Sequence, residues 1–220
     1  MTEETERMKT DDLIATLAAQ PAPAPAASIE GRAGLGSVAG LAVTVVLFFL
    51  VLGPRAGLGT ALMDPVVLAK TALPLLLAAF AWVLAVRSAR PAVPSGKTGR
   101  AVWLVPAAVG ALFFWALGAT EAGQRLILFL GHSTQVCIPA ITVLSLPILA
   151  GLINALKRGA PVHPTRSGAL AGLAAAGLST AVYSLFCTED SPLFYAVWYS
   201  VAIGVATGIG ALAGRRFLRW

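Results

Sequence analysis

The lysine and arginine residues of this chain are confined to short segments between long apolar runs. Thirteen of the 16 fall into four groups, and the remaining three are Arg55, Arg125 and Lys70. Each apolar run has about the 17 to 25 residues that a spanning helix needs, and basic residues gather on the cytoplasmic side of membrane proteins. The pattern therefore predicts a polytopic membrane protein, and it explains the basic isoelectric point without direct nucleic-acid binding.

Six apolar runs predict an all-α fold, a bundle of six transmembrane helices. The runs occupy residues 34–52, 66–86, 101–118, 136–156, 168–186 and 193–213. The four basic groups lie before the first run, after the second, after the fourth and after the sixth, so we expect both termini in the cytoplasm. The bundle, 34–213, is then flanked by a cytoplasmic segment, 1–33, and a basic tail, 214–220.

Glycines four residues apart in the last two runs predict close packing of those helices. The pairs are Gly168 with Gly172, Gly204 with Gly208, and Gly210 with Gly214.

The segment before the first run is predicted to contain a short cytoplasmic helix over about residues 10–19. Two first-turn aspartates suit the helix dipole and three apolar residues form one stripe: Asp11, Asp12, Leu13, Ile14 and Leu17. A Pro/Ala linker, 20–28, separates this helix from the bundle. Since so short a helix is unstable alone in water, its stripe needs a partner. The surrounding acidic residues favour a protein over an anionic membrane surface, and a disordered tail is the alternative.

The two cysteines, Cys137 and Cys187, lie at matching depth on the side of the membrane opposite the termini. They belong to the fourth and fifth helices, which a short loop makes antiparallel neighbours. Together with His132, Glu189 and Asp190 they would form a soft-metal or oxidant site, although their spacing is not diagnostic of one. From the residues alone, a sensing pair, a structural disulfide and plain packing thiols all stay open.

Ionisable residues inside the runs are nearly absent, and Lys70 is the one that qualifies. We expect it near the external end of the second helix, as an interfacial anchor or a partner of Asp64. Because transporters usually need such residues in the middle of the membrane, a small-molecule transporter or channel is the alternative, and a regulatory binding protein is the first choice. The chain lacks a Cys-x-x-Cys motif and any catalytic constellation, so we expect neither a thiol oxidoreductase nor another enzyme, and no cofactor.

Four blocks of the sequence are distinctive. The most specific is Cys187-Thr-Glu-Asp-Ser-Pro-Leu-Phe194, which runs into Trp198-Tyr199. The others are Met8-Lys-Thr-Asp-Asp-Leu-Ile14, the stretch around Lys70 followed by Arg87-Ser-Ala-Arg-Pro91, and Leu156-Lys-Arg-Gly-Ala-Pro161. From about residue 8 to its end, the chain resembles the NrsF-type membrane anti-sigma factors of proteobacteria. At position 188 the chain has threonine, whereas the pattern of this family has proline.

The resemblance implies a multi-pass protein of the bacterial inner membrane that binds an extracytoplasmic-function sigma factor and keeps it from RNA polymerase. The implied sigma-binding positions are Lys9, Asp11, Asp12, Leu13, Ile14 and Leu17. It also implies that Cys137 and Cys187, facing the periplasm, take part in the response to heavy metals or oxidants. The sigma factor and membrane lipid are thus the expected partners, and an external signal at the cysteine pair is expected to release the sigma factor.

Overall fold

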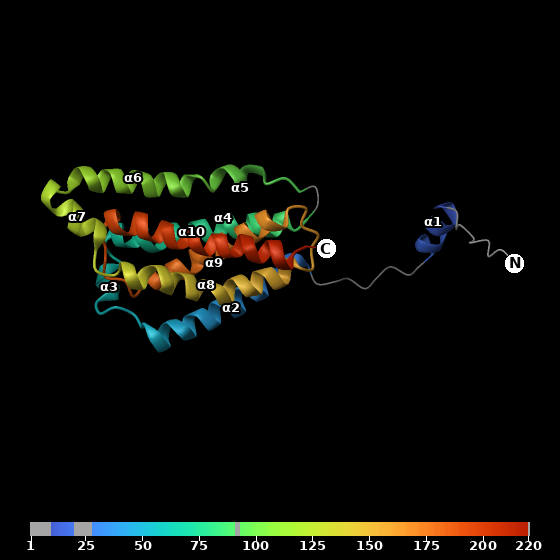
Figure 1. Ribbon diagram of the computed structural model, residues 1–220, viewed down its shortest axis with the longest axis horizontal. Helices are drawn as coiled ribbons and strands as arrows, with labels where there is room; N and C mark the ends of the chain where they lie inside the picture. Colours follow the sequence, from blue (N-terminus) through green and yellow to red (C-terminus); the bar gives the residue numbers. More distant parts are fainter. Residues whose placement is uncertain (1–9, 20–27, 91–92, 220) are drawn as a thin grey trace.

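The computed structural model describes residues 10–19, 28–90 and 93–219, and all secondary structure in these residues is helical (Figure 1). Lys9 and most of the predicted linker lie outside the described residues. A short helix, α1, spans Thr10–Ala18. The long helices are α2 (Ile29–Val51), α4 (Pro65–Ser88), α6 (Leu104–Ala119), α8 (Thr134–Leu156), α9 (Pro164–Ser184) and α10 (Pro192–Phe217). Short helices lie between them: α3 (Leu58–Ala61), α5 (Gly96–Ala101) and α7 (Ala122–Leu130).

Local capping signals set where several of these helices begin. The Ser28 side chain accepts a hydrogen bond from Gly31 N at the start of α2, so this helix begins five residues before the predicted run. The Asp64 carboxylate accepts from Val66 N at the start of α4, and the Ser191 hydroxyl accepts from Leu193 N at the start of α10. A proline follows each of these two caps, where its missing N–H removes no helical hydrogen bond.

Five helical stretches in the described part of the chain have the length and hydropathy of a membrane-crossing helix. They are α2, α4, α5 together with α6, α8 and α10. The architecture is thus that of an all-helical membrane protein. The predicted third run is divided between α5 and α6 by a non-helical turn, and α7 was not predicted. The amphipathic α7 lies between the predicted third and fourth runs, outside every predicted helix.

Helix α9 corresponds to the predicted fifth run but is less apolar than the five other stretches. Of its 21 residues, 13 are buried, and it packs against α2, α4, α8 and α10. Because these neighbours surround it, its side chains do not have to be soluble in lipid. Alanine, glycine, serine and threonine are sufficient there, and they let the surrounding backbones approach closely.

The glycine pairs explain the closest of these contacts. Gly168 and Gly172 of α9 face Gly210 and Gly214 of α10, and a Cβ atom on Gly168 would overlap the backbone of both partners. The prediction of close packing is therefore confirmed for these two pairs. It is wrong for Gly204 and Gly208, where a Cβ atom would meet nothing within 4 Å.

A second close contact joins α2 to α8. A Cβ atom on Gly40 would lie 2.6 Å from Ile148 Cα, and one on Gly36 would lie 2.6 Å from Gly151 O. Next to this contact the Thr44 hydroxyl donates a hydrogen bond of 2.8 Å to Leu144 O.

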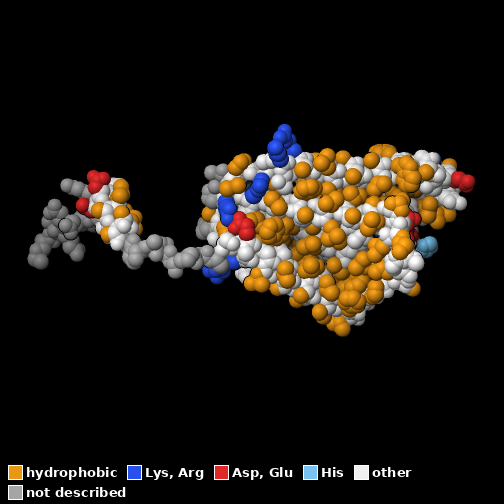
Figure 2. All heavy atoms as spheres, turned by 180° about the vertical axis from the view of Figure 1, so that it is seen from behind, with side chains coloured by type: hydrophobic (Ala, Val, Ile, Leu, Met, Phe, Trp, Pro, Cys, Tyr) orange, Lys and Arg blue, Asp and Glu red, His pale blue; other side chains and the backbone are white. Residues whose placement is uncertain are grey.

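The long helices alternate in direction, so the loops gather at two ends of the bundle (Figure 1). We call them the thiol end (loops 52–57, 131–133 and 185–191) and the basic end (loops 89–95 and 157–163 with the carboxyl terminus). Figure 2 shows the exposed Lys and Arg side chains toward the basic end.

Candidate functional site

The two cysteines lie in one buried cluster at the thiol end. Cys137 is in the first turn of α8, and Cys187 is in the loop that follows α9. Both thiols are free and fully buried. The cluster that surrounds them includes Phe48, Tyr183 and Tyr199. The two thiols therefore share one dry environment, and neither is bridged.

Two tyrosine hydroxyls accompany the thiols. Tyr183 from α9 and Tyr199 from α10 lie within electrostatic range of both sulfur atoms. The rings of the two tyrosines are in edge-on contact, with centroids 5.9 Å apart. Neither hydroxyl meets the geometry of a hydrogen bond with any described group. Both hydroxyls are nevertheless close enough to interact with the thiols, so they are the polar groups that share the buried cluster with Cys137 and Cys187.

Lys70 enters the same region from α4, with its side chain fully shielded from solvent. Its Nζ donates to Cys187 O (2.6 Å), Glu189 O (3.1 Å) and Asp190 Oδ1 (3.1 Å). These three acceptors use all the donors of an ammonium group. Lys70 therefore binds the loop that carries Cys187 instead of reaching out to the membrane interface. Asp64 is not its partner, because that carboxylate caps α4.

Arg55, from the loop after α2, completes this ion network. Its guanidinium forms a two-point contact with Asp190, Nη1 to Oδ1 at 2.7 Å and Nη2 to Oδ2 at 2.9 Å. Nη1 also donates to Cys187 O, and Arg55 N donates to Leu185 O. We call Arg55, Lys70 and Asp190 the latch, since together they hold the backbone of the 185–191 loop against α4.

The latch determines how Asp190 and Arg55 titrate. Burial alone would raise the pKa of Asp190, but the hydrogen bond from Arg55 and the charge of Lys70 outweigh it, so this pKa lies below its ordinary value of 3.8. The hydrogen bond to Asp190 raises the pKa of Arg55 above its ordinary value. Both groups are therefore ionised at neutral pH, and the latch is a fixed set of charges.

The remaining residues of the predicted metal site are separated from the thiols. Glu189 Oε1 accepts a hydrogen bond from His132 N (2.8 Å), while the imidazole of His132 is 92% exposed. Asp190 is committed to the latch. Among the described residues, no group of three or more His, Cys, Asp and Glu side chains is arranged to hold a metal ion. The structure brings the two thiols together but not the wider ligand set.

Helix α1 carries the described residues of the predicted sigma-binding segment. None of its residues is buried, and Asp11 and Asp12 lie in its first turn. The Thr16 hydroxyl donates to Asp12 O within the helix. Figure 1 shows α1 apart from the bundle, so none of the other described residues covers its apolar stripe.

Sequence reasoning missed the role of Arg55 and the partner of Lys70. Arg55, Lys70 and Asp190 are among the few charged residues in the segments opposite the basic groups. Residues of opposite charge in a nearly uncharged region indicate that an ion pair forms there. The partners themselves could not be read from the chain, because 120 residues separate Lys70 from Asp190.

Comparison with known proteins connects this architecture to one family. The family NrsF, "Negative regulator of sigma F", matches residues 17–220. The chain is 36% identical to "Anti-sigma-F factor NrsF" of Caulobacter vibrioides, with 97% of this chain and 100% of that protein covered. It is 34% identical to "Probable anti-sigma-F factor NrsF" of Azospira oryzae, with the same coverage. No solved structure matches the chain.

The family match begins at residue 17, so it covers the whole bundle, both thiols and the latch, but only the last residues of α1. The matches to the two relatives extend further, since each covers 97% of this chain. The helical architecture and this similarity lead to one conclusion: the chain belongs to the NrsF family, whose members are regulatory proteins and not enzymes.

Proposed function

We propose that this chain is an anti-sigma factor of the bacterial inner membrane that holds an extracytoplasmic-function sigma factor through its amino-terminal segment. The observation that carries the proposal is the uncovered stripe of α1, in which Leu13, Ile14 and Leu17 are 45%, 58% and 57% exposed. The names of the relatives, anti-sigma-F factors, indicate the class of partner that covers such a stripe.

The chemistry of α1 suits a helix-in-groove contact. Nine residues are too few for a stable isolated helix, so a partner that buries the stripe also stabilises the helix. Asp11 and Asp12 flank the stripe with negative charge, which favours a groove with a basic rim. Lys9 completes the proposed contact set just before the helix. A sigma factor held in this way is withheld from RNA polymerase.

The proposed topology has six spans and both termini in the cytoplasm. Helix α9 is the sixth span, because it runs between the same two ends as its neighbours and is buried among them. The basic end then faces the cytoplasm and the thiol end faces the periplasm. Reporter fusions test this arrangement: those after residue 95 and at the carboxyl terminus should report cytoplasm, and those after residues 57 and 190 should report periplasm. Inverted results at two of these positions would refute it.

The proposed signal acts at the thiol pair. Cys187 is the point where the cluster and the latch meet, since its thiol is in the cluster and its carbonyl accepts from Lys70 and Arg55. Modification of either thiol by a heavy metal or an oxidant would need space that this buried cluster lacks, so the 185–191 loop has to move. That movement shifts α9 and α10 against α4, and the bundle favours a second arrangement with lower affinity for the sigma factor. A coupling of about 1.4 kcal/mol gives a tenfold release.

The direct test of partner binding uses the full chain and a variant lacking residues 8–20, each purified in detergent. We expect the sigma factor to bind the full chain and to lose binding to the variant, while both insert equally well in the membrane. Equal capture by the two proteins would move the contact to the cytoplasmic loops and contradict the proposal.

The sensing role is tested separately with Cys137→Ser, Cys187→Ser and the double variant. We expect each single change to blunt the transcriptional response to cadmium, chromate or a thiol oxidant, and the double change to add nothing further, because the two groups act as one unit. Ser200→Ala is a suitable control, since its hydroxyl bonds only within α10. A double variant that still represses and still responds would reduce the cysteines to packing residues.

A further inference from the structure

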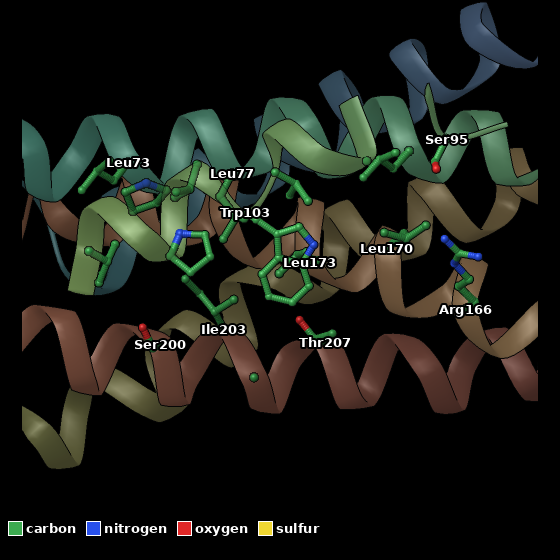
Figure 3. Close-up of a pocket in the computed structure, with 18 of the residues that line it drawn as sticks. Leu73, Leu77, Ser95, Trp103, Arg166, Leu170, Leu173, Ser200, Ile203 and Thr207 are labelled. Atoms are coloured by element: carbon green, nitrogen blue, oxygen red, sulfur yellow. The ribbon is translucent and has the colours of Figure 1, made fainter. Parts of the chain in front are cut away.

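We propose that the cleft between α4, α6, α9 and α10 binds one anionic phospholipid, with the phosphate at Arg87 and Arg166 and an acyl chain along the cleft. The cleft has a volume of about 1040 Å³ and opens on the side of the bundle where α6 packs only lightly against α4 and α10 (Figure 3). The inference requires the membrane placement described above but not the binding of a sigma factor.

The middle of the cleft is apolar. Figure 3 shows Leu73 and Leu77 on one side, Leu170 and Leu173 behind, and Ile203 on the opposite side. From Lys70 to Arg87 the α4 wall is about 26 Å long at 1.5 Å per residue. This is close to the roughly 30 Å thickness of the hydrocarbon core of a bilayer, so an acyl chain of one leaflet is fully accommodated.

The two ends of the cleft differ in their capacity for a headgroup. At the thiol end Lys70 lines the cleft, but its three donors are already used by the 185–191 loop. At the basic end Arg87 donates one hydrogen bond, to Ser95 O, and Arg166 has no hydrogen bond or ion pair with any described residue. The uncommitted positive charge therefore lies at the basic end, which favours a phosphate there.

A buried hydroxyl next to these arginines supplies a second, independent indication. Ser167 lines the cleft, is 1% exposed, and its Oγ has no hydrogen-bond partner among the described residues. Thr207 Oγ1, further along the cleft, is also buried without a partner. A phosphate or ester oxygen at the basic end would accept the Ser167 hydrogen bond, so an anionic lipid fits this end better than hydrocarbon alone.

The test uses the full-length chain in nanodiscs with equal amounts of phosphatidylglycerol and phosphatidylcholine. After transfer to detergent, native mass spectrometry counts the lipid molecules that each protein retains. We expect one retained phosphatidylglycerol on the unmodified chain. In Arg87→Gln/Arg166→Gln we expect retention to fall by about 25-fold, roughly a factor of five for each arginine.

Two further variants make the test specific. Arg158→Gln removes an equal charge at the basic end but outside the cleft, and it should retain lipid as the unmodified chain does. Leu173→Trp fills the apolar part of the cleft and should displace the lipid with both arginines intact. The single Arg166→Gln variant, at an exposed position, provides the answer if the double variant does not insert.

Equal retention of the two lipids, or equal losses in Arg166→Gln and Arg158→Gln, would overturn the proposal. Loss of lipid in Leu173→Trp without any dependence on headgroup or arginine would also overturn it, because only a generic apolar crevice would then remain. Capture of the sigma factor through α1, measured on the same variants, reports on the proposed function independently.

Discussion

Helix α1 leaves every described side chain accessible, whereas the 185–191 loop buries Cys187 and holds its carbonyl oxygen with two cationic side chains. The stripe of α1 is apolar, and no other part of the chain that the structure describes covers it. The loop is polar, and the latch satisfies its Cys187 and Glu189 carbonyls and the Asp190 carboxylate. The chain thus leaves the interacting surface of α1 largely unused, whereas it already pairs these polar groups of the loop.

This difference supports the proposal that the protein binds its partner through α1 and changes conformation at the 185–191 loop. A segment with unused apolar surface gains free energy from a partner, while a segment with satisfied charges resists movement until something disrupts it. Helices α9 and α10 touch the thiol cluster at one end of the bundle and reach the basic end at the other.

The largest effect is expected from charges placed on the α1 stripe. Leu13→Asp/Leu17→Asp should weaken capture of the sigma factor by more than 100-fold, since burial of each leucine contributes about 1.5–3 kcal/mol. The thermal stability of the bundle should not change, because neither residue contacts it. Binding measured by biolayer interferometry on nanodisc-embedded protein checks the first expectation, and thermal unfolding checks the second.

Ala15→Asp is the matched control for this experiment. It adds one negative charge, half of what the stripe variant adds, to the same helix on the face opposite the stripe, so it should keep most of the binding. If Ala15→Asp and the stripe variant lose binding equally, the acidic charge and not the stripe would be responsible, and the contrast between α1 and the loop would fail.

A comparable effect on stability is expected at the latch. Asp190→Asn removes the carboxylate that pairs with both Arg55 and Lys70 and leaves the buried Lys70 with carbonyl oxygens alone. Breaking a fully buried ion pair from one side lowers the free energy of unfolding by about 3–5 kcal/mol. Because the Asp190 side chain is 33% exposed, we expect a smaller loss of about 2–3 kcal/mol here. Unfolding in detergent micelles, followed by circular dichroism, measures the loss.

Glu121→Gln serves as the reference, since this exposed carboxylate at the same end caps no helix with its side chain. We expect no measurable change there. The thiols should also become easier to label in Asp190→Asn than in Glu121→Gln, because the loop that shields Cys187 is loosened. Equal stability and equal labelling of the two variants would show that the latch does not hold the loop.

A smaller effect is expected at the contact between α9 and α10, the elements that connect the two regions. Gly168→Ala places a methyl group against the backbone of α10 and should lower the unfolding free energy by about 1–3 kcal/mol. Gly204→Ala, where nothing lies within 4 Å, should be neutral or raise it by about 0.5–1 kcal/mol, because alanine favours the helix. A reversed order of the two variants in thermal unfolding would contradict the packing described for this contact.

The smallest effect near neutral pH is expected from titration of the latch. The pKa of Asp190 is lower in the folded protein than its ordinary value of 3.8, so the carboxylate contributes stability that is fully present above that value. This contribution is lost as the pH falls below 3.8. The stability difference between the unmodified chain and Asp190→Asn should therefore stay constant from pH 8 down to about 5 and shrink only in stronger acid. A difference that already declines between pH 7 and 5 would place another titrating group in the latch.

Much of the helical framework follows from sequence pattern alone. Apolar runs of spanning length predict the long helices, because hydropathy depends on residues close together in the chain. The family was also recognisable from short blocks such as the one that begins at Cys187. In contrast, α7 is not among the predicted helices, because nine residues are too few to form an apolar run of spanning length. Gly204 and Gly208 were misread, since spacing along a helix does not reveal which face meets a neighbour.

The class of protein, the apolar stripe of α1 and the separation of basic residues from the rest can all be read from the sequence, because each depends on residues close together in the chain. The structure was needed to show that α9 lies among its neighbours, that Lys70 pairs with Asp190 instead of Asp64, and that both thiols are buried in one cluster. These features depend on which helix faces meet. That choice arises from close packing of small residues and from the need to pair buried charges, and both act between residues far apart in sequence.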